Sequence, residues 1–385
     1  MVNFLLSLLH PQVNNLLLYE VMRDFRMGGL TPVNYADFIS EINSLPKIEL
    51  REEKHLRAFD RFGFKDVTED DFNTIMREVN KRIIQKSKKC WHPNASSSTC
   101  DLDNAGNIKI TAAHSLQNNG ILSRIAENSH VVTYDKDIAE FHAKKVSKNV
   151  ASTFFGFCNT HDAIFRPIEV DSYNKTDEQN FLFAYRGFVV SAHAKYVASN
   201  LINYGAQADN DISENIRIFN DAIKRKDYSI IETEVFELPN HYPFAATASF
   251  YLDYDFEGNP IVHSDDRMEY IFISFFPIEK KSYFLLSFFK KDSSLYKNLG
   301  YQIRKRNNVK SDVSVMLAGH VENIFFNPIY FSTFIEKFEH EIEALVEETQ
   351  QDLAMVNDKG ESKGTVSFTS SSYLENKYGI NLFGY

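Results

Sequence analysis

The stretch YIFISFFPIEKKSYFLLSFF, residues 270–289, decides the fold class. Two aromatic runs, 270–276 and 283–289, flank the short polar segment 277–282 that begins with proline. Apolar and aromatic runs of this length, separated by turn residues, are typical of two antiparallel strands joined in a hairpin. The region from 171 to 356 is therefore expected to hold an antiparallel sheet.

Helical patterns surround the predicted sheet. Apolar residues recur at helical spacing within 178–204, and further helices are expected at 213–225 and 331–355. The predicted architecture is α+β. Its four parts are a helical N-terminal region (1–89), a small Cys/His metal module (90–170), an α+β domain of antiparallel strands flanked by helices (171–356), and a mobile linker with a C-terminal tail (357–385).

The composition is that of a globular chain with an acidic balance. Of 385 residues, 43% are hydrophobic and 24% charged, which provides for a large core and excludes wholesale disorder. The net charge of -10 argues against bulk, non-specific phosphate binding but is compatible with a local basic patch. No run reaches the roughly 18–20 apolar residues of a membrane span, and the N-terminus lacks a cationic signal-peptide start. A cytoplasmic protein without a membrane partner is expected.

All three cysteines, Cys90, Cys100 and Cys158, lie within one short part of the chain. An odd number in a reducing compartment is poor material for a disulfide framework. Inert buried cysteines are the alternative, because free cysteine is often buried. Their neighbours favour a metal site instead: His92 follows Cys90 by two residues, and His161 follows Cys158 by three.

Zinc takes four nitrogen or sulfur ligands in a tetrahedron, and structural sites often draw two from each of two short segments. Cys158 and His161 fit on one turn, and the polar loop PNASSST, residues 93–99, lets Cys90 and Cys100 approach each other. The preferred set is therefore Cys90, Cys100, Cys158 and His161. His92 is the reserve ligand.

A basic strip precedes this module and consists of Arg77, Lys81, Lys88 and Lys89. On a continuous helix, most of these side chains would share one face that ends at Cys90. Such a strip is either a solvated helix face or a local contact for the phosphates of DNA or RNA.

The order of elements in residues 90–170 resembles a zinc-stapled HNH, or ββα-metal, nuclease module of treble-clef-like layout. Cys90 and Cys100 correspond to its first knuckle, and the strand 108–114 delivers His114, the counterpart of the base. Asn118 or Asn119 corresponds to the loop asparagine, and residues 156–165 correspond to the second knuckle and its helix.

The resemblance implies that His114 deprotonates water while a catalytic Mg²⁺ or Mn²⁺, held partly by His161 or Asp162, stabilises the scissile phosphate. Two departures weaken it. His161 cannot ligate zinc and a catalytic ion together, which leaves His130 as a substitute ligand or as an ordinary strand-end histidine. His114 and His161 are also far apart, which requires an insertion near 125–150. His114 itself is a base, a metal ligand or a structural histidine.

Two functions follow. In the first, the protein acts in nucleic-acid processing or anti-phage defence, as an HNH-like nuclease, and the chain also resembles uncharacterised bacterial proteins found near phage-defence genes. Its partners are then DNA, RNA or another protein of a defence system. In the second, it is a non-catalytic interaction or sensor protein in which zinc is purely structural.

Overall fold

The computed structural model describes residues 87–137, 140–199, 206–264, 267–321, 323–349, 352–356, 362–367 and 374–384. The predicted helical region up to residue 86, with Arg77 and Lys81, lies outside the described residues. The chain forms two compact units, one made of 89–194, 210–351 and 369–385 and the other of 1–88, 195–209 and 352–368. In the latter, β10 (Asp352–Val356) and β11 (Ser362–Ser367) pair as an antiparallel hairpin.

The larger unit is built on a seven-stranded antiparallel sheet, whose order in the described chain is β3-β2-β9-β6-β7-β8-β5. The predicted hairpin is confirmed, since Ile271 pairs with Phe288 and Pro277 with Ser282. The strands are β2 (His130–Asp137), β3 (Glu140–Ser147), β5 (Ile231–Leu238), β6 (Phe244–Phe250), β7 (Ile271–Pro277), β8 (Ser282–Phe289) and β9 (Ile324–Phe326).

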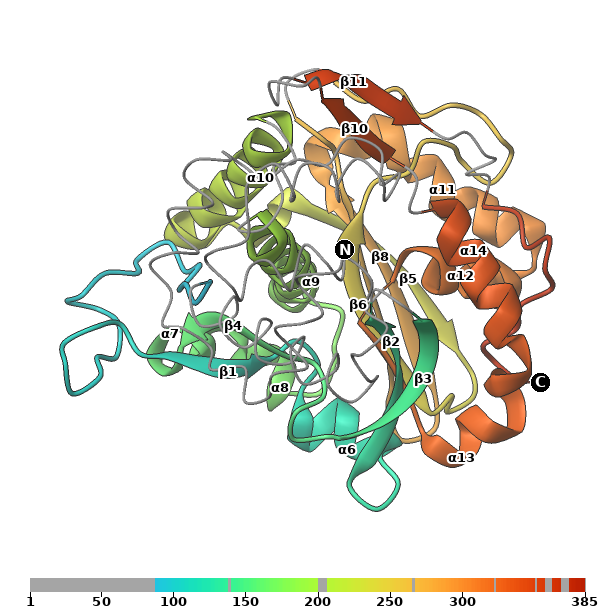
Figure 1. The fold of residues 1–385 in the computed structure, drawn as a ribbon, viewed down its shortest axis with the longest axis horizontal. Helices are drawn as coiled ribbons and strands as arrows, with labels where there is room; N and C mark the ends of the chain where they lie inside the picture. The colour runs from blue at the N-terminus through green and yellow to red at the C-terminus, as the bar shows by residue number, and fades with distance from the viewer. Residues whose placement is uncertain are drawn as a thin grey trace, which may run out of the picture. The chain divides into compact units, whose positions relative to one another are not determined.

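Helices cover both faces of the sheet (Figure 1). On one face, strand residues such as Phe275 and Leu286 share a core with α11 (Ser293–Arg306), α12 (Val309–His320) and α14 (Glu339–Thr349). On the other, Phe272 contacts Phe188 of α9 (Asp177–Ser199) and Phe219 of α10 (Ala206–Arg225). Every residue of β7 and β8 is buried, which explains why these strands are apolar throughout rather than alternating.

The segment predicted as a separate Cys/His module is divided between two sheets. β1 (Ile110–His114) pairs with β4 (Thr153–Cys158) in a small antiparallel sheet. The chain between them forms η1 (Asn118–Leu122) and α6 (Ser123–Ile125) and then contributes β2 and β3 to the large sheet. Residues 89–194 consequently fold into the same unit as 210–351, and the predicted boundary at 170/171 does not separate compact units.

Three further parts differ from the sequence prediction. No helix was predicted for the basic stretch after β8, but it forms α11, because Tyr296, Leu299 and Ile303 give it one buried stripe. The predicted mobile tail packs into the core: Leu382 and Phe383 are buried, and the Tyr330 hydroxyl donates to the Leu382 carbonyl at 2.8 Å. Residues predicted as helix at the end of 331–355 form β10 instead.

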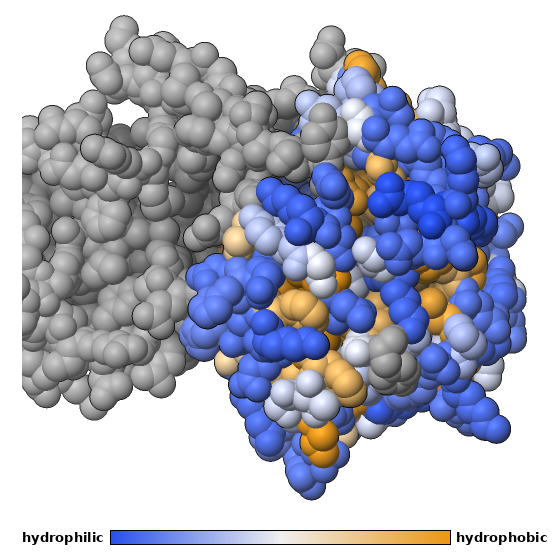
Figure 2. Space-filling view, turned by 90° about the vertical axis from the view of Figure 1, so that its right-hand side faces the viewer, coloured by the Kyte–Doolittle hydropathy of each residue, from blue (hydrophilic) through white to orange (hydrophobic). Residues whose placement is uncertain are grey.

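The outer surface beside α11, α12 and α14 is mostly hydrophilic, and its apolar side chains form small separate areas in the coloured part of Figure 2. Such scattered apolar residues are normal on globular proteins. In the described part of the chain, no helix combines the length and apolar character needed to cross a bilayer.

Candidate metal centre

Three segments bring four metal-ligating side chains together. Cys90 lies in an extended stretch that is hydrogen-bonded to β4, where Trp91 N–H donates to the Gly156 carbonyl at 2.9 Å. Cys100 ends the polar loop, and its N–H donates to the Ser96 carbonyl at 2.9 Å. The remaining pair comes from the end of β4 and the short helix α7 (Asn159–Asp162), which carry Cys158 and His161.

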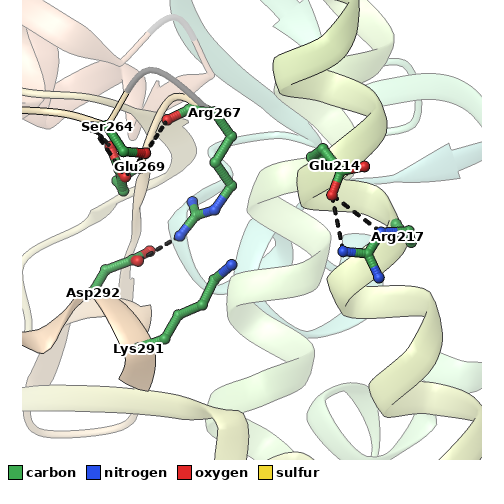
Figure 3. Close-up of a pocket in the computed structure, with 7 residues that line it drawn as sticks. All are labelled: Glu214, Arg217, Ser264, Arg267, Glu269, Lys291 and Asp292. Carbon is green, nitrogen blue, oxygen red and sulfur yellow. Dashed lines mark hydrogen bonds and ion pairs between the residues drawn. The ribbon is translucent and has the colours of Figure 1, made fainter.

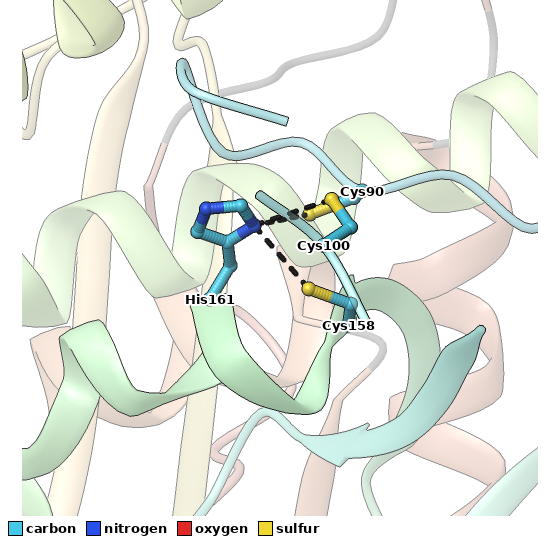
Figure 4. A group of neighbouring side chains, drawn as sticks. All are labelled: Cys90, Cys100, Cys158 and His161. Carbon is cyan, nitrogen blue, oxygen red and sulfur yellow. Dashed lines mark hydrogen bonds between the residues drawn. The ribbon is translucent and has the colours of Figure 1, made fainter. Parts of the chain in front are cut away.

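The four ligand atoms of Cys90, Cys100, Cys158 and His161 lie within 4.8 Å of one another. Nδ1 of His161 is 3.5 Å from the sulfur of Cys90, 3.4 Å from that of Cys100 and 3.3 Å from that of Cys158 (Figure 4). The residues preferred from the sequence thus form a compact Cys3His group that could bind a metal ion.

These distances fit a shared ion better than hydrogen bonding. Nδ1 carries either one proton or one lone pair, so it cannot form three good hydrogen bonds with three thiols. In a tetrahedral zinc site, Zn–S bonds of about 2.3 Å and Zn–N bonds of about 2.0 Å place sulfur and nitrogen about 3.5 Å apart. The three sulfur–nitrogen distances around His161 match that separation. The group is consistent with a structural zinc site.

The group is enclosed by protein. Cys158 is fully buried, and Cys90, Cys100 and His161 are each less than a tenth exposed. In the metal-free chain, burial raises the pKa of Cys90 to about 12 and also raises the pKa of Cys100. A bound cation reverses this preference, because it stabilises the thiolate form directly.

Asp101 connects the cysteine loop to α7. Its carboxylate accepts hydrogen bonds from the Thr160 N–H at 2.7 Å and the Thr160 hydroxyl at 2.9 Å. These bonds lower the pKa of Asp101 and satisfy a free N–H at the start of α7. Asp101 was not predicted as a site residue, although its position directly after Cys100 is a usable signal.

His92, the reserve ligand of the sequence analysis, lies outside the group of four. Its ring stacks on that of His161, with centroids 4.1 Å apart and planes 13° from parallel. Its Nδ1 accepts the Asn94 N–H at 3.2 Å. His92 therefore restrains the orientation of the His161 ring, as neighbours of metal ligands commonly do.

Aromatic packing fixes the metal group against α9. The Tyr185 hydroxyl of α9 donates to the Trp91 carbonyl at 3.3 Å, next to Cys90. Phe157, which precedes Cys158, contacts the rings of Phe165 and Tyr185 at centroid distances of 5.2 and 6.1 Å. Cys90 and Cys158 are thus each next to a residue that contacts the buried Tyr185 of α9.

His114 lies at the other end of the small sheet from the metal group. It pairs with Thr153, whereas Ile110 pairs with Cys158, so four strand positions, about 14 Å, separate the two ends. This placement excludes His114 from the Cys3His group. Of the candidate loop residues, Asn118 donates to the Asn149 side chain at 3.0 Å, and Asn119 is exposed.

His114 and three charged side chains, Asp162, Arg186 and Glu169, form an electrostatic cluster. Burial lowers the pKa of His114, the backbone of Asn149 and Lys148 opposes this shift by hydrogen bonding, and Arg186 adds to the lowering. Burial raises the pKa of Asp162, against the effect of the same arginine. Arg186 pairs with Glu169 of α8 (Arg166–Glu169) at 2.5 Å. In the described chain, His114 Nε2, Asp162 Oδ1 and Arg186 Nε are buried without a hydrogen-bond partner.

The sequence analysis did not find Arg186 or Glu169. A single arginine in the apolar run FLFAYRGFVV was a signal, because a lone charge in a buried helix needs a partner. His130 lies at the start of β2, where its Nδ1 contacts the Asn128 carbonyl at 2.8 Å, and it joins neither cluster. Lys88 and Lys89 lie in chain without regular secondary structure rather than on the predicted helix.

Comparison with known proteins adds no relative. No family model matches the sequence, and neither the curated proteins nor the solved structures give a match. The functional argument therefore rests on the geometry of this chain.

Proposed function

We propose that the protein binds one zinc ion through Cys90, Cys100, Cys158 and His161, and that it is a non-catalytic interaction or sensor protein in which the ion is structural. The observation that carries this proposal is the convergence of three sulfurs on one enclosed ring nitrogen. Four protein ligands complete a tetrahedron and leave no position for water or substrate, as in structural zinc sites.

The ion would join parts of the chain that few other contacts hold together. Residues 89–101 have little regular structure, and their links to β4 and α7 are a few hydrogen bonds. Zinc would fasten this segment to the end of β4 and to α7, which pack beside α9. Zinc binding would thereby give a rigid surface, made of the loop, the end of the strand and the short helix, that a partner could recognise.

Metal analysis of the purified full-length chain tests the zinc proposal. About one zinc per chain is expected, and Cys158→Ser should lose the metal and melt at a lower temperature, because structural zinc contributes directly to folding. Ser98→Ala, a change in the exposed part of the same loop, should keep both. Folded wild-type protein that neither contains nor takes up zinc would overturn the proposal.

A second candidate function, an HNH-like nuclease acting in nucleic-acid processing or defence, is favoured by one observation. β1 ends in His114 and pairs with β4, and α7 follows β4, which gives the ββα order. His114 Nε2 has no hydrogen-bond partner among the described residues. For this nitrogen to accept a proton from an attacking water, water must reach its buried position. The described residues offer no second group of converging ligands for Mg²⁺ or Mn²⁺. The nuclease function is therefore less well supported than the structural zinc site.

His114→Ala separates the two functions, with His130→Ala as the matched control. If the protein is a nuclease, the first variant loses cleavage of DNA or RNA while zinc content is unchanged, and the second keeps it. If the protein is non-catalytic, wild type is inert on single- and double-stranded substrates with magnesium or manganese. Cleavage that survives His114→Ala would exclude His114 as the base.

A further inference from the structure

A polar cavity of about 560 Å³ opens beside α10 and involves no residue of the metal group. Its volume is within the range of roughly 300–1,000 Å³ that is usual for small-molecule sites. Unlike most such sites it is lined almost wholly by charged side chains, namely Glu214, Arg217, Ser264, Arg267, Glu269, Lys291 and Asp292 (Figure 3).

The acidic residues of this cavity are already engaged by protein donors. Glu214 accepts from Arg217 Nε and Nη2 at 3.1 and 2.9 Å. Glu269 accepts from the Ser264 hydroxyl and contacts the His263 ring. Asp292 Oδ1 accepts a hydrogen bond from Arg267. Protein donors therefore compensate much of the negative charge in the wall, although Asp292 Oδ2 is buried without a hydrogen-bond partner in the described chain.

Arg267 is a fixed donor in the wall. It is only 6% exposed, and its two terminal nitrogens are held by the Asn215 amide oxygen at 3.0 Å, the Met268 carbonyl and Asp292. Its Nε donates to no group in the described chain and faces the side of α10 in Figure 3. A buried guanidinium held in this way presents its remaining N–H with little loss of side-chain entropy.

Lys291 supplies a further cation to the cavity wall. It belongs to η4 (Lys290–Asp292), and its Nζ points into the space between Arg267 and α10 (Figure 3). It forms no ion pair with any described residue, in contrast to the two arginines of the wall. Burial and the neighbouring Arg267 lower the pKa of Lys291, whereas Asp292 and Glu214 oppose this shift.

We propose that this cavity binds a small molecule through its anionic group, a phosphate or a carboxylate, with Lys291 Nζ and Arg267 Nε as donors. Both groups match the oxyanion chemistry of such ligands, and each bond would be charge-assisted. The engaged carboxylates around them disfavour highly charged polyanions. The site is independent of zinc and of His114, so its test does not depend on either proposed function.

Calorimetric titration of the full chain with inorganic phosphate, and separately with acetate, tests this site. Saturable binding of at least one anion is expected. The anion that binds with the higher affinity shows whether the site prefers a phosphate or a carboxylate group. Lys291→Met should weaken binding about tenfold or more, since a hydrogen bond to a charged group is lost. Lys290→Met, the exposed neighbour outside the cavity wall, should bind as wild type.

A chemical readout supports the calorimetry. Lys291 should be modified by an amine-directed reagent near neutral pH faster than Lys290, and the bound anion should protect it. Absence of saturable binding by both anions would overturn the proposal, as would unchanged binding by Lys291→Met. Equal losses in the Lys290 and Lys291 variants would also overturn it, because they would reflect surface charge rather than a site.

Discussion

Asp101 accepts two hydrogen bonds from Thr160, one from the backbone N–H at 2.7 Å and one from the hydroxyl at 2.9 Å. These residues are 59 positions apart in the chain, and each is next to a member of the Cys3His group, Cys100 or His161. The contact therefore links the loop that ends at Cys100 to the short helix that carries His161.

The first prediction concerns this contact. Asp101→Ala should lower the zinc affinity by up to about tenfold, in line with other losses of outer-shell support. Thr160→Val, which removes only the hydroxyl bond, should have a smaller effect. Asp103→Ala is the control, because the Asp103 carboxylate accepts hydrogen bonds from the Ala105 and Asn107 N–H groups of its own turn. Competition with a chromophoric chelator measures all three, and equal affinities for the Asp101 variant and wild type would refute the role.

The second prediction distinguishes a ligand from a supporting ring at His92. Because His92 stacks on His161 and lies outside the group of four, His92→Ala should retain about one zinc per chain with weaker affinity. His161→Ala should lose the metal. Elemental analysis of both variants decides the point, and a zinc-free His92→Ala protein would make His92 a ligand after all.

The local part of the metal site was predictable from the sequence, and the reason is geometric. Cys158 and His161 are three residues apart on one turn, so their proximity needs no knowledge of the fold. Cys90 and Cys100 could be added because the chain has no other thiol. The stack of His92 on His161 was not predictable, since it depends on the path of the loop between 92 and 100.

The parts that the sequence did not reveal depend on long-range contacts. β1 and β4 pair across an inserted segment whose own strands, β2 and β3, join another sheet. The buried stripe of α11 was hidden by the basic residues around Tyr296, Leu299 and Ile303. The tail residues Leu382 and Phe383 show no periodicity, and only the fold supplies the surface that buries them.

The third prediction is a pH dependence set by His193 of α9. This side chain is 5% exposed, and its Nδ1 has no hydrogen-bond partner in the described chain. Burial lowers its pKa to about 4 from an ordinary value near 6.5. Between these values the unfolded chain binds more protons than the folded one, so stability falls as the pH decreases from about 6.5 towards 4.

The expected loss from His193 between pH 7 and pH 5 is roughly 2 kcal/mol. His193→Leu removes the titrating group and places an apolar side chain of similar size beside Phe154. Urea denaturation at the two pH values should show a smaller loss of stability in the variant than in wild type. An identical loss in both proteins would show that His193 titrates normally.

The last prediction concerns the basic residues that precede Cys90. Lys88 and Lys89 lie outside any helix, so the predicted helical face does not continue to Cys90. Lys89 is exposed, and its Nζ lies 4.4 Å from the centre of the Trp91 ring. If the zinc module contacts nucleic acid, Lys89 is the described lysine of this set best placed to meet a phosphate beside the metal group.

We therefore expect weak, salt-sensitive binding of single-stranded DNA or RNA that falls when Lys81, Lys88 and Lys89 are changed to Glu together. Each lost phosphate contact should reduce the slope of log affinity against log salt by about 0.7. Lys109→Glu, an exposed charge change elsewhere in the module, is the matched control and should leave the slope unchanged. Fluorescence anisotropy at several salt concentrations measures both quantities. A triple variant with wild-type affinity and slope would leave these lysines as solvated surface and would favour a protein partner for the zinc-stapled module.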